Sequence, residues 1–124
     1  NVQILMPEFS DARISKWCSF SFVEELLEAG VRIFFYQKGF IHSKLIMVDG
    51  VFCSIGTTNL DFRSLETNFE INTFIYDEAF TRQLTGFYHA DLLNSREIVA
   101  GEWKKRTKLA HWKESLAHLI SPMY

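Results

Sequence analysis

Two apolar runs near the start of the chain flank an amphipathic stretch. Residues 2–6 and 31–36 are apolar at nearly every position, which is typical of strands covered on both faces of a sheet. Between them apolar residues recur at helical spacing, after a candidate N-cap at Ser10 or Asp11 and before Gly30. A strand, a helix and a second strand in this order predict a βαβ unit with parallel strands.

The next segment alternates short apolar runs with turns. Residues 45–48 and 51–55 flank Asp49-Gly50, a dipeptide that strongly predicts a β-hairpin. A polar turn over residues 56–59 follows the second strand of this hairpin.

The remaining elements are one strand and two helices. Residues 69–76 predict a strand, whereas 79–93 and 103–120 have helical spacing. The whole order predicts an α/β fold, a mixed β-sheet flanked by helices, in a single domain over residues 1–124.

Composition and charge narrow the class of protein. Hydrophobic residues make up 48% of the chain, enough for a compact core. The formal net charge of -2 argues against a nucleic-acid binder, which would have a strongly basic face. Cys18 and Cys53 lack metal-ligand spacing and are expected to be buried thiols in a reducing compartment.

No part of the sequence has the pattern of a membrane span or a signal peptide. A span needs about 20 consecutive apolar residues, and no run approaches that length. The chain starts at Asn1, directly in a predicted strand, so we expect it to be a piece of a longer protein whose membrane anchor, if any, lies elsewhere.

Residues with chemical potential cluster from position 42 onward. On a strand, His42 and Lys44 would point to the same side, roughly 7 Å apart, and together they suit an anionic ligand. Thr57 and Asn59 add hydroxyl, amide and backbone donors for phosphate oxygens. Glu70 provides a carboxylate that could hold one imidazole nitrogen and leave the other free to attack.

Each of these residues has an ordinary structural explanation when taken alone. A single histidine in a strand is usually structural, and a single lysine such as Lys44 is usually a solvated charge. Asp49 before Gly50 is first of all a turn former. Glu70 would be merely a solvent-facing strand residue, so the functional hypothesis depends on the whole set at fixed spacing.

The complete pattern resembles a known signature. His42-x-Lys44-(x)4-Asp49-(x)6-Gly56-Thr57-x-Asn59, with Glu70 eleven residues beyond Asn59, is similar to the motif of the phospholipase D superfamily. The flanking segments resemble the C-terminal catalytic half of bacterial cardiolipin synthases over nearly the whole chain. They are Glu24–Val31, Tyr36–Phe40, Asn59–Ser64, Asn68–Glu70 and Leu119–Pro122.

The resemblance implies a metal-free phosphatidyl transfer in two steps, without a cofactor. His42 would be the nucleophile or the general acid, and a second histidine would come from another half. Lys44, Thr57 and Asn59 would bind the phosphate. Glu70 would orient His42, and Asp49, although part of the catalytic motif, would mainly support the architecture.

The resemblance also implies partners and a location. Phosphatidylglycerol would be both donor and acceptor, the products would be cardiolipin and glycerol, and no nucleic acid would bind. The other motif-bearing half, or a second copy, would complete the site, so the chain alone should be inactive. The enzyme would work at the bacterial cell membrane with its catalytic domain outside the bilayer, and this stretch itself would be soluble.

Two other functions stay open at this point. One is a phosphodiesterase of the same superfamily, a nuclease or a lipid hydrolase, that works as a homodimer. The other is a non-catalytic half that serves only for pairing.

The helix predicted over 103–120 has two interpretations. Its basic residues and tryptophans predict contact with an anionic membrane surface. Alternatively, an apolar stripe docks the helix on the sheet while the charges are solvated. The basic and aromatic set is Trp103, Lys104, Lys105, Arg106, Lys108, Trp112 and Lys113, and the stripe is Leu109, Trp112, Leu116 and Leu119.

Overall fold

A computed structural model describes residues 1–10 and 13–120. The elements, in chain order, are β1 (Gln3–Pro7), α1 (Arg13–Ser21), α2 (Val23–Glu28), β2 (Arg32–Tyr36), β3 (Lys44–Val48), β4 (Phe52–Gly56), the π-helical turn η1 (Arg63–Thr67), β5 (Asn72–Ile75), α3 (Glu78–Leu92), β6 (Ser95–Glu97), α4 (Ala100–Lys104) and α5 (Lys108–Ile120).

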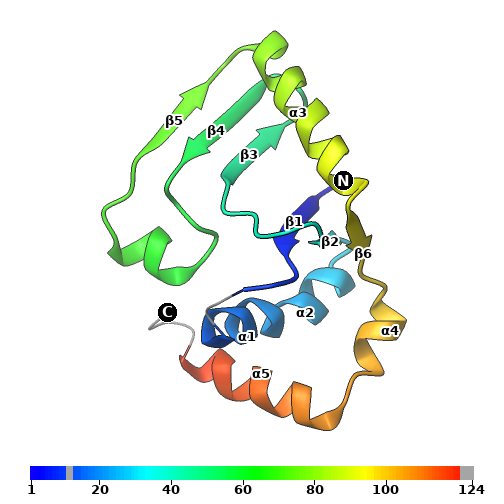
Figure 1. The fold of residues 1–124 in the computed structure, drawn as a ribbon. Coiled ribbons are helices and arrows are strands. Elements are labelled where there is room, and N and C mark those ends of the chain that lie inside the picture. Colours follow the sequence, from blue (N-terminus) through cyan, green and yellow to red (C-terminus); the bar gives the residue numbers. More distant parts are fainter. Residues whose placement is uncertain (11–12, 121–124) are drawn as a thin grey trace.

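The strands form two three-stranded sheets with helices beside them (Figure 1). In the first sheet β2 pairs with β1 in parallel and with β6 antiparallel, so this sheet is mixed. In the second sheet β4 lies between β3 and β5, and both pairings are antiparallel. The predicted α/β class is confirmed, although the strands are divided between two sheets where the sequence suggested one. Apolar patterns identify strands but not their hydrogen-bonding partners.

The predicted βαβ unit is present, but its helix is broken at Phe22. The Ser21 hydroxyl donates to the Cys18 carbonyl at 2.7 Å, and the Phe22 amide donates to the Ser19 carbonyl at 3.4 Å. These short-range bonds compete with the helical ladder, so α1 ends and α2 begins.

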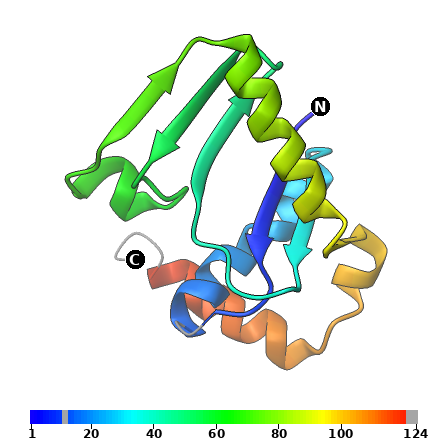
Figure 2. The ribbon, with the colours of Figure 1, turned by 45° about the horizontal axis from the view of Figure 1, so that its top comes forward.

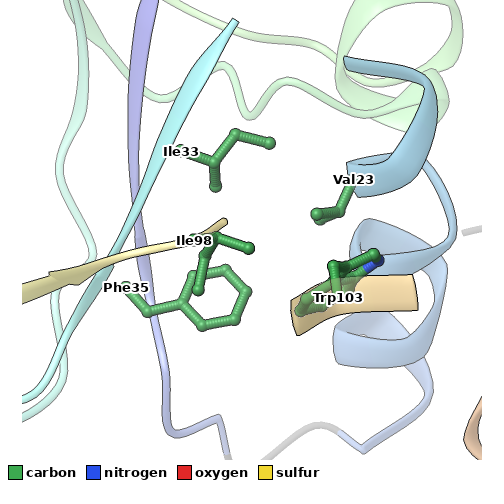
Figure 3. Close-up of a cluster of buried hydrophobic side chains, with 5 residues drawn as sticks. All are labelled: Val23, Ile33, Phe35, Ile98 and Trp103. Atoms are coloured by element: carbon green, nitrogen blue, oxygen red, sulfur yellow. The ribbon is translucent and has the colours of Figure 1, made fainter. Parts of the chain in front are cut away.

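The main core lies between the first sheet and helices α1, α2 and α4. Figure 3 shows side chains from β2, α2, α4 and the residue after β6 meeting there. The Phe20 ring stacks on Phe35 with centroids 4.8 Å apart and meets Trp103 edge-on at 5.5 Å. The buried members of this cluster are Val23, Ile33, Phe35, Ile98 and Trp103.

Helix α3 packs against one face of the second sheet and also contacts β2 and β6 (Figure 2). Cys53 on β4 and Thr81 on α3 are fully buried. The Thr85 hydroxyl donates to the Met47 sulfur at 3.7 Å, which fixes Met47 on the α3 side of β3. Cys18 is also buried, and both thiols are free, as predicted.

The Asp49-Gly50 hairpin is confirmed. Asp49 has φ 49° and Gly50 has φ 72°, the positive values that a type I′ turn requires at both central residues. The Val51 amide donates to the Val48 carbonyl at 3.0 Å and closes the turn.

The helix predicted over 103–120 is two helices. Trp103 belongs to α4 and is buried in the main core, and residues 105–107 separate α4 from α5. The Arg106 guanidinium lies 3.2 Å from the centre of the Trp103 ring and donates to Glu114 at 2.6 and 2.9 Å. These contacts turn the chain and fix α5. Strand β6, only three residues long, was not predicted.

The packing face of α5 also differs from the predicted stripe. Trp112, Leu116 and Leu119 are 67%, 47% and 77% exposed, and the side chain of Leu109 lies outside the described residues. Instead Ala117 and Glu114 are buried, and the Cys18 thiol donates to the Ala117 carbonyl at 3.4 Å. α5 therefore docks on α1 with the small residue Ala117 in the contact, while Glu114 pairs with Arg106 ahead of α5. Over residues 1–10 and 13–120 we find no helix with both the length and the apolar character of a membrane span.

Candidate phosphodiester site

One row of paired residues crosses the end of the second sheet. Lys44 on β3 lies opposite Gly56 on β4, and Gly56 lies opposite Asn72 on β5. Residues paired across neighbouring strands point to the same face, so Lys44 and Asn72 flank a position that has no side chain.

Gly56 is required by this close approach. A Cβ atom at Gly56 would lie 2.0 Å from Asn72 Oδ1 and 2.2 Å from the Ile71 carbonyl oxygen. Real Cβ atoms never approach other heavy atoms so closely, so only glycine fits here. The motif glycine thus lets the start of β5 lie directly against β4.

The turn after Gly56 is tied to β5 by hydrogen bonds from consecutive residues. The Thr57 amide donates to the Ile71 carbonyl at 3.0 Å, and the Ile71 amide donates to the Thr57 hydroxyl at 2.9 Å. The next residue, Thr58, accepts a hydrogen bond from the Asn72 side-chain amide. Asn59 follows with an exposed side chain.

Glu70 is held by its neighbours within this chain. The Thr57 hydroxyl donates to one carboxylate oxygen, and the Asn68 amide donates to the other at 3.4 Å. The pKa of Glu70 is below its usual value, mainly because of the hydrogen bond from Thr57. The Ser64 hydroxyl, the Asn68 amide and the positive charge of Lys44 act in the same direction.

Ser64 is a neighbour of Glu70 that the sequence did not reveal. Ser64 is 6% exposed. Its hydroxyl has no well-formed hydrogen bond to the described residues, but it lies close enough to Glu70 to lower the pKa of that carboxyl. Ser64 lies in η1, where the Asn68 amide donates to the Arg63 carbonyl at 2.7 Å. Such π-type turns often occur at functional sites, but the sequence pattern does not signal them.

His42 lies in the segment just before β3 and is exposed. Its ring stacks on the Phe40 ring with centroids 5.6 Å apart, and its carbonyl accepts a hydrogen bond from Lys44 Nζ at 3.0 Å. In residues 1–10 and 13–120 no hydrogen bond joins the His42 ring to Glu70, so the orienting role of Glu70 stays a prediction. β3 begins at Lys44, which places His42 ahead of the strand that the sequence suggested for both.

Asp49 lies at the opposite end of the hairpin from the other motif residues. Asp49 lies five positions beyond Lys44, which corresponds to roughly 17 Å along an extended strand. Its positive φ identifies it as a turn residue. The supporting role of Asp49 in the architecture stays a prediction.

Lys44 also belongs to an exposed apolar face of the second sheet. Side chains alternate along a strand, so Lys44, Ile46 and Val48 point away from Met47 and α3. Their cross-strand partners continue the same surface, where Phe52 contacts Phe74 and Tyr76. We call this the open face; its large apolar members are 42–84% exposed and comprise Ile46, Val48, Phe74 and Tyr76.

Taken together, the arrangement suits a phosphate ester. One cation and the 57–59 turn lie at one end of a sheet, with an exposed imidazole nearby and an ionised carboxylate behind the turn. Among the described residues, no group of three His, Cys, Asp or Glu side chains is placed to hold a metal ion.

The chain is similar in sequence to known proteins over nearly its whole length. The family model described as "Cardiolipin synthase, PLD-like domain" matches residues 1–92. The chain is 40% identical over 123 residues to cardiolipin synthase 1 of Staphylococcus aureus strain COL, covering 99% of this chain and 25% of that protein. It is 43% identical over 122 residues to cardiolipin synthase 1 of Staphylococcus epidermidis strain ATCC 12228, covering 98% and 25%. It is 39% identical over 123 residues to the major cardiolipin synthase ClsA of Bacillus subtilis strain 168, covering 99% and 26%.

No solved structure matches the chain. The chain spans about a quarter of the length of the curated relatives that it matches. The family match covers most of the described residues and includes His42, Lys44, the 57–59 turn and Glu70. The chain therefore belongs to the family of cardiolipin synthase, phospholipase D-like domains.

Proposed function

We propose that this chain is one catalytic half of a phosphatidyltransferase that converts two phosphatidylglycerol molecules into cardiolipin and glycerol. The observation that carries this proposal is the row from Lys44 through Gly56 to Asn72, with the 57–59 turn and Glu70 beside it. The relatives, each named a cardiolipin synthase, support the choice of reaction.

The reaction would proceed by two displacements at phosphorus. One histidine, His42 or its counterpart in the other half, attacks the phosphorus of the donor lipid, and the bond to the glycerol headgroup breaks. The other histidine gives a proton to the departing glycerol oxygen. A hydroxyl of the second phosphatidylglycerol then attacks the phosphohistidine, loses its proton to that other histidine and takes over the phosphatidyl group. Splitting one difficult displacement into two lowers the barrier of each.

Lys44, Thr57 and Asn59 would stabilise the charge that develops on the phosphate oxygens. Donors fixed in advance act most strongly on charge that forms in the transition state. The anchoring of the turn to β5 supports this role, because it fixes the donors before the substrate binds. Glu70 would hold His42 once the site is complete.

The open face is where the other half would bind. It contains Lys44, and its apolar residues continue directly from the phosphodiester site. A surface of large exposed apolar residues next to a reactive site is typical of a protein interface. The occupant would be the other motif-bearing half of the same protein or a second copy. The reaction would take place at the bacterial cell membrane, with the catalytic domain outside the bilayer.

The test uses the longer protein that contains this chain, incubated with radiolabelled phosphatidylglycerol and analysed by thin-layer chromatography. Labelled cardiolipin together with free glycerol is the expected result, and His42→Ala should abolish both. Phosphatidic acid as the main product would indicate a hydrolase instead. No turnover by a folded, full-length protein would indicate a pairing module and overturn the proposal.

A further inference from the structure

We propose that Asn72 is a positioning residue of the phosphodiester site, which holds the 57–59 turn beside Lys44 without touching the substrate. This inference rests on the function proposed above. Asn72 lies outside the His42-to-Asn59 motif and two residues beyond Glu70.

Asn72 occupies the end of the row that begins at Lys44. Because Gly56 has no side chain, the Asn72 carboxamide reaches over β4, and its Oδ1 atom fills the place where a Cβ of residue 56 would be. The Asn72 side chain therefore lies on the same face as Lys44, with only the Gly56 backbone between them.

The other end of the Asn72 carboxamide fixes the turn. Its Nδ2 atom donates a partly buried hydrogen bond to the Thr58 hydroxyl. Thr57 is already bound to the backbone of Ile71, so consecutive turn residues are bound to consecutive residues at the start of β5. Hydrogen bonds at both Thr57 and Thr58 prevent a rotation of the turn that a bond at one of these residues alone would allow.

The bond from Asn72 to Thr58 would set the distance between two proposed phosphate ligands, Asn59 and Lys44. Asn59 follows Thr58 directly, and Lys44 lies across Gly56 from Asn72. Without the bond from Asn72 to Thr58, the turn can move relative to β3 and carry Asn59 with it. Small displacements of groups that stabilise a transition state lower the rate strongly.

The test compares turnover by the longer protein with Thr58→Val, Thr58→Ser, Asn72→Ala and the double variant Thr58→Val with Asn72→Ala. Thr58→Val keeps the shape but removes the acceptor, so kcat should fall about tenfold, with KM changed less. Thr58→Ser keeps the hydroxyl and should stay within about twofold of the wild type. If the two residues act through one bond, the double variant is no slower than Asn72→Ala. Thr73→Val, on the opposite face of β5, is the matched control and should leave kcat unchanged.

A second measurement does not depend on catalysis. In the longer protein, hydrogen exchange of the Thr57 amide should become at least tenfold faster in Thr58→Val, whereas Thr58→Ser should leave it unchanged. If the wild type makes no cardiolipin, the proposed function fails, and the exchange result still decides whether Asn72 holds the turn. Thr58→Val with unchanged Thr57 exchange, or with kcat within twofold of an active wild type, would overturn the positioning role.

Discussion

The Thr57 hydroxyl donates a hydrogen bond to Glu70 across a separation of 13 residues. Thr57 follows β4 and Glu70 precedes β5, so this bond closes the excursion of the chain through η1. The same hydroxyl accepts a hydrogen bond from the Ile71 amide at 2.9 Å. Thr57 therefore links the backbone of one proposed phosphate-binding turn to the carboxylate that the proposed mechanism assigns to His42.

This link predicts a change in the titration of Glu70. Thr57→Val removes the donor and should raise the pKa of Glu70 toward its ordinary value. The depressed pKa contributes stability that is fully present above the ordinary Glu pKa of about 4.3 and is lost as the pH falls through the lower value of the folded chain. Carbon-detected NMR titration of the Glu70 carboxyl gives both values. The Thr58 hydroxyl pairs with Asn72 instead, so Thr58→Val should leave the pKa of Glu70 unchanged. An equal shift in both variants would contradict the assignment of the lowered pKa to the Thr57 hydroxyl.

His42 is predicted to be essential for turnover and dispensable for folding. Its side chain is exposed and its ring contact is with Phe40, so His42→Ala leaves no cavity in the core. In the longer protein, cardiolipin synthesis should be lost while the melting temperature stays within about 2 °C of the wild-type value. A loss of about 1 kcal/mol in unfolding free energy would shift it by more. His89→Ala, at an exposed position of α3, is the control and should be fully active. More than a few per cent of wild-type synthesis in a folded His42→Ala protein would exclude a role as nucleophile or acid.

Lys44 should not tolerate arginine. Its ammonium lies 3.0 Å from the His42 carbonyl, a contact that a compact group on a flexible stem makes and a planar fork does not reproduce. Lys44→Arg should therefore lose most of its activity, as should Lys44→Met, which lacks the charge. Lys38→Arg in the preceding exposed segment provides the comparison, and steady-state kinetics with phosphatidylglycerol is the measurement. Full activity of Lys44→Arg would show that charge alone suffices.

Gly56→Ala should destabilise the chain, whereas Gly86→Ala should stabilise it. The new methyl at position 56 would overlap Asn72 Oδ1 and the Ile71 carbonyl, and overpacking of this kind costs about 1–3 kcal/mol. At position 86, inside α3, a Cβ meets nothing within 4 Å, and alanine is favoured over glycine in a helix by about 0.5–1 kcal/mol. Urea denaturation of the 124-residue chain measures both. A Gly56→Ala chain as stable as the wild type would mean that β5 does not approach β4 as closely as described.

The sequence predicted elements well where local chemistry decides them. The Asp49-Gly50 turn, the βαβ unit and the two buried thiols agree with the structure. It failed where particular side-chain bonds end or divide a helix. Ser21 broke the first helix by a local bond to a carbonyl, and Arg106 ended α4 by pairing with Glu114, eight residues away. The spacing of hydrophobic residues along the chain indicates neither of these bonds.

The sequence grouped the candidate site residues but did not reveal which of them are bonded to one another. The motif named Lys44, Thr57 and Glu70, and the structure places them around one end of the second sheet. Spacing alone could not show that Glu70 bonds to Thr57, or that Asn68 and Ser64 surround the carboxylate. Such contacts depend on the path of η1, which no local pattern predicts.

The basic segment near the end of the chain should not bind anionic membranes. Trp103 is buried, Arg106 pairs with Glu114, and Lys104 Nζ lies 2.6 Å from Glu28, so two of the charges that suggested a lipid contact already have ion-pair partners. The hydrogen bond to Glu28 also raises the pKa of Lys104.

Co-sedimentation with anionic vesicles at low salt tests this expectation. Lys104→Glu and Lys105→Glu each reverse one charge, but only Lys104 forms an ion pair with α2 in the described structure. Wild type and both variants should remain in the supernatant alike. Thermal unfolding should separate them, because Lys104→Glu places like charges beside Glu24 and Glu28 and lowers the melting temperature, whereas Lys105→Glu does not. Vesicle binding by the wild type that Lys105→Glu abolishes would restore the membrane contact through the exposed end of α4.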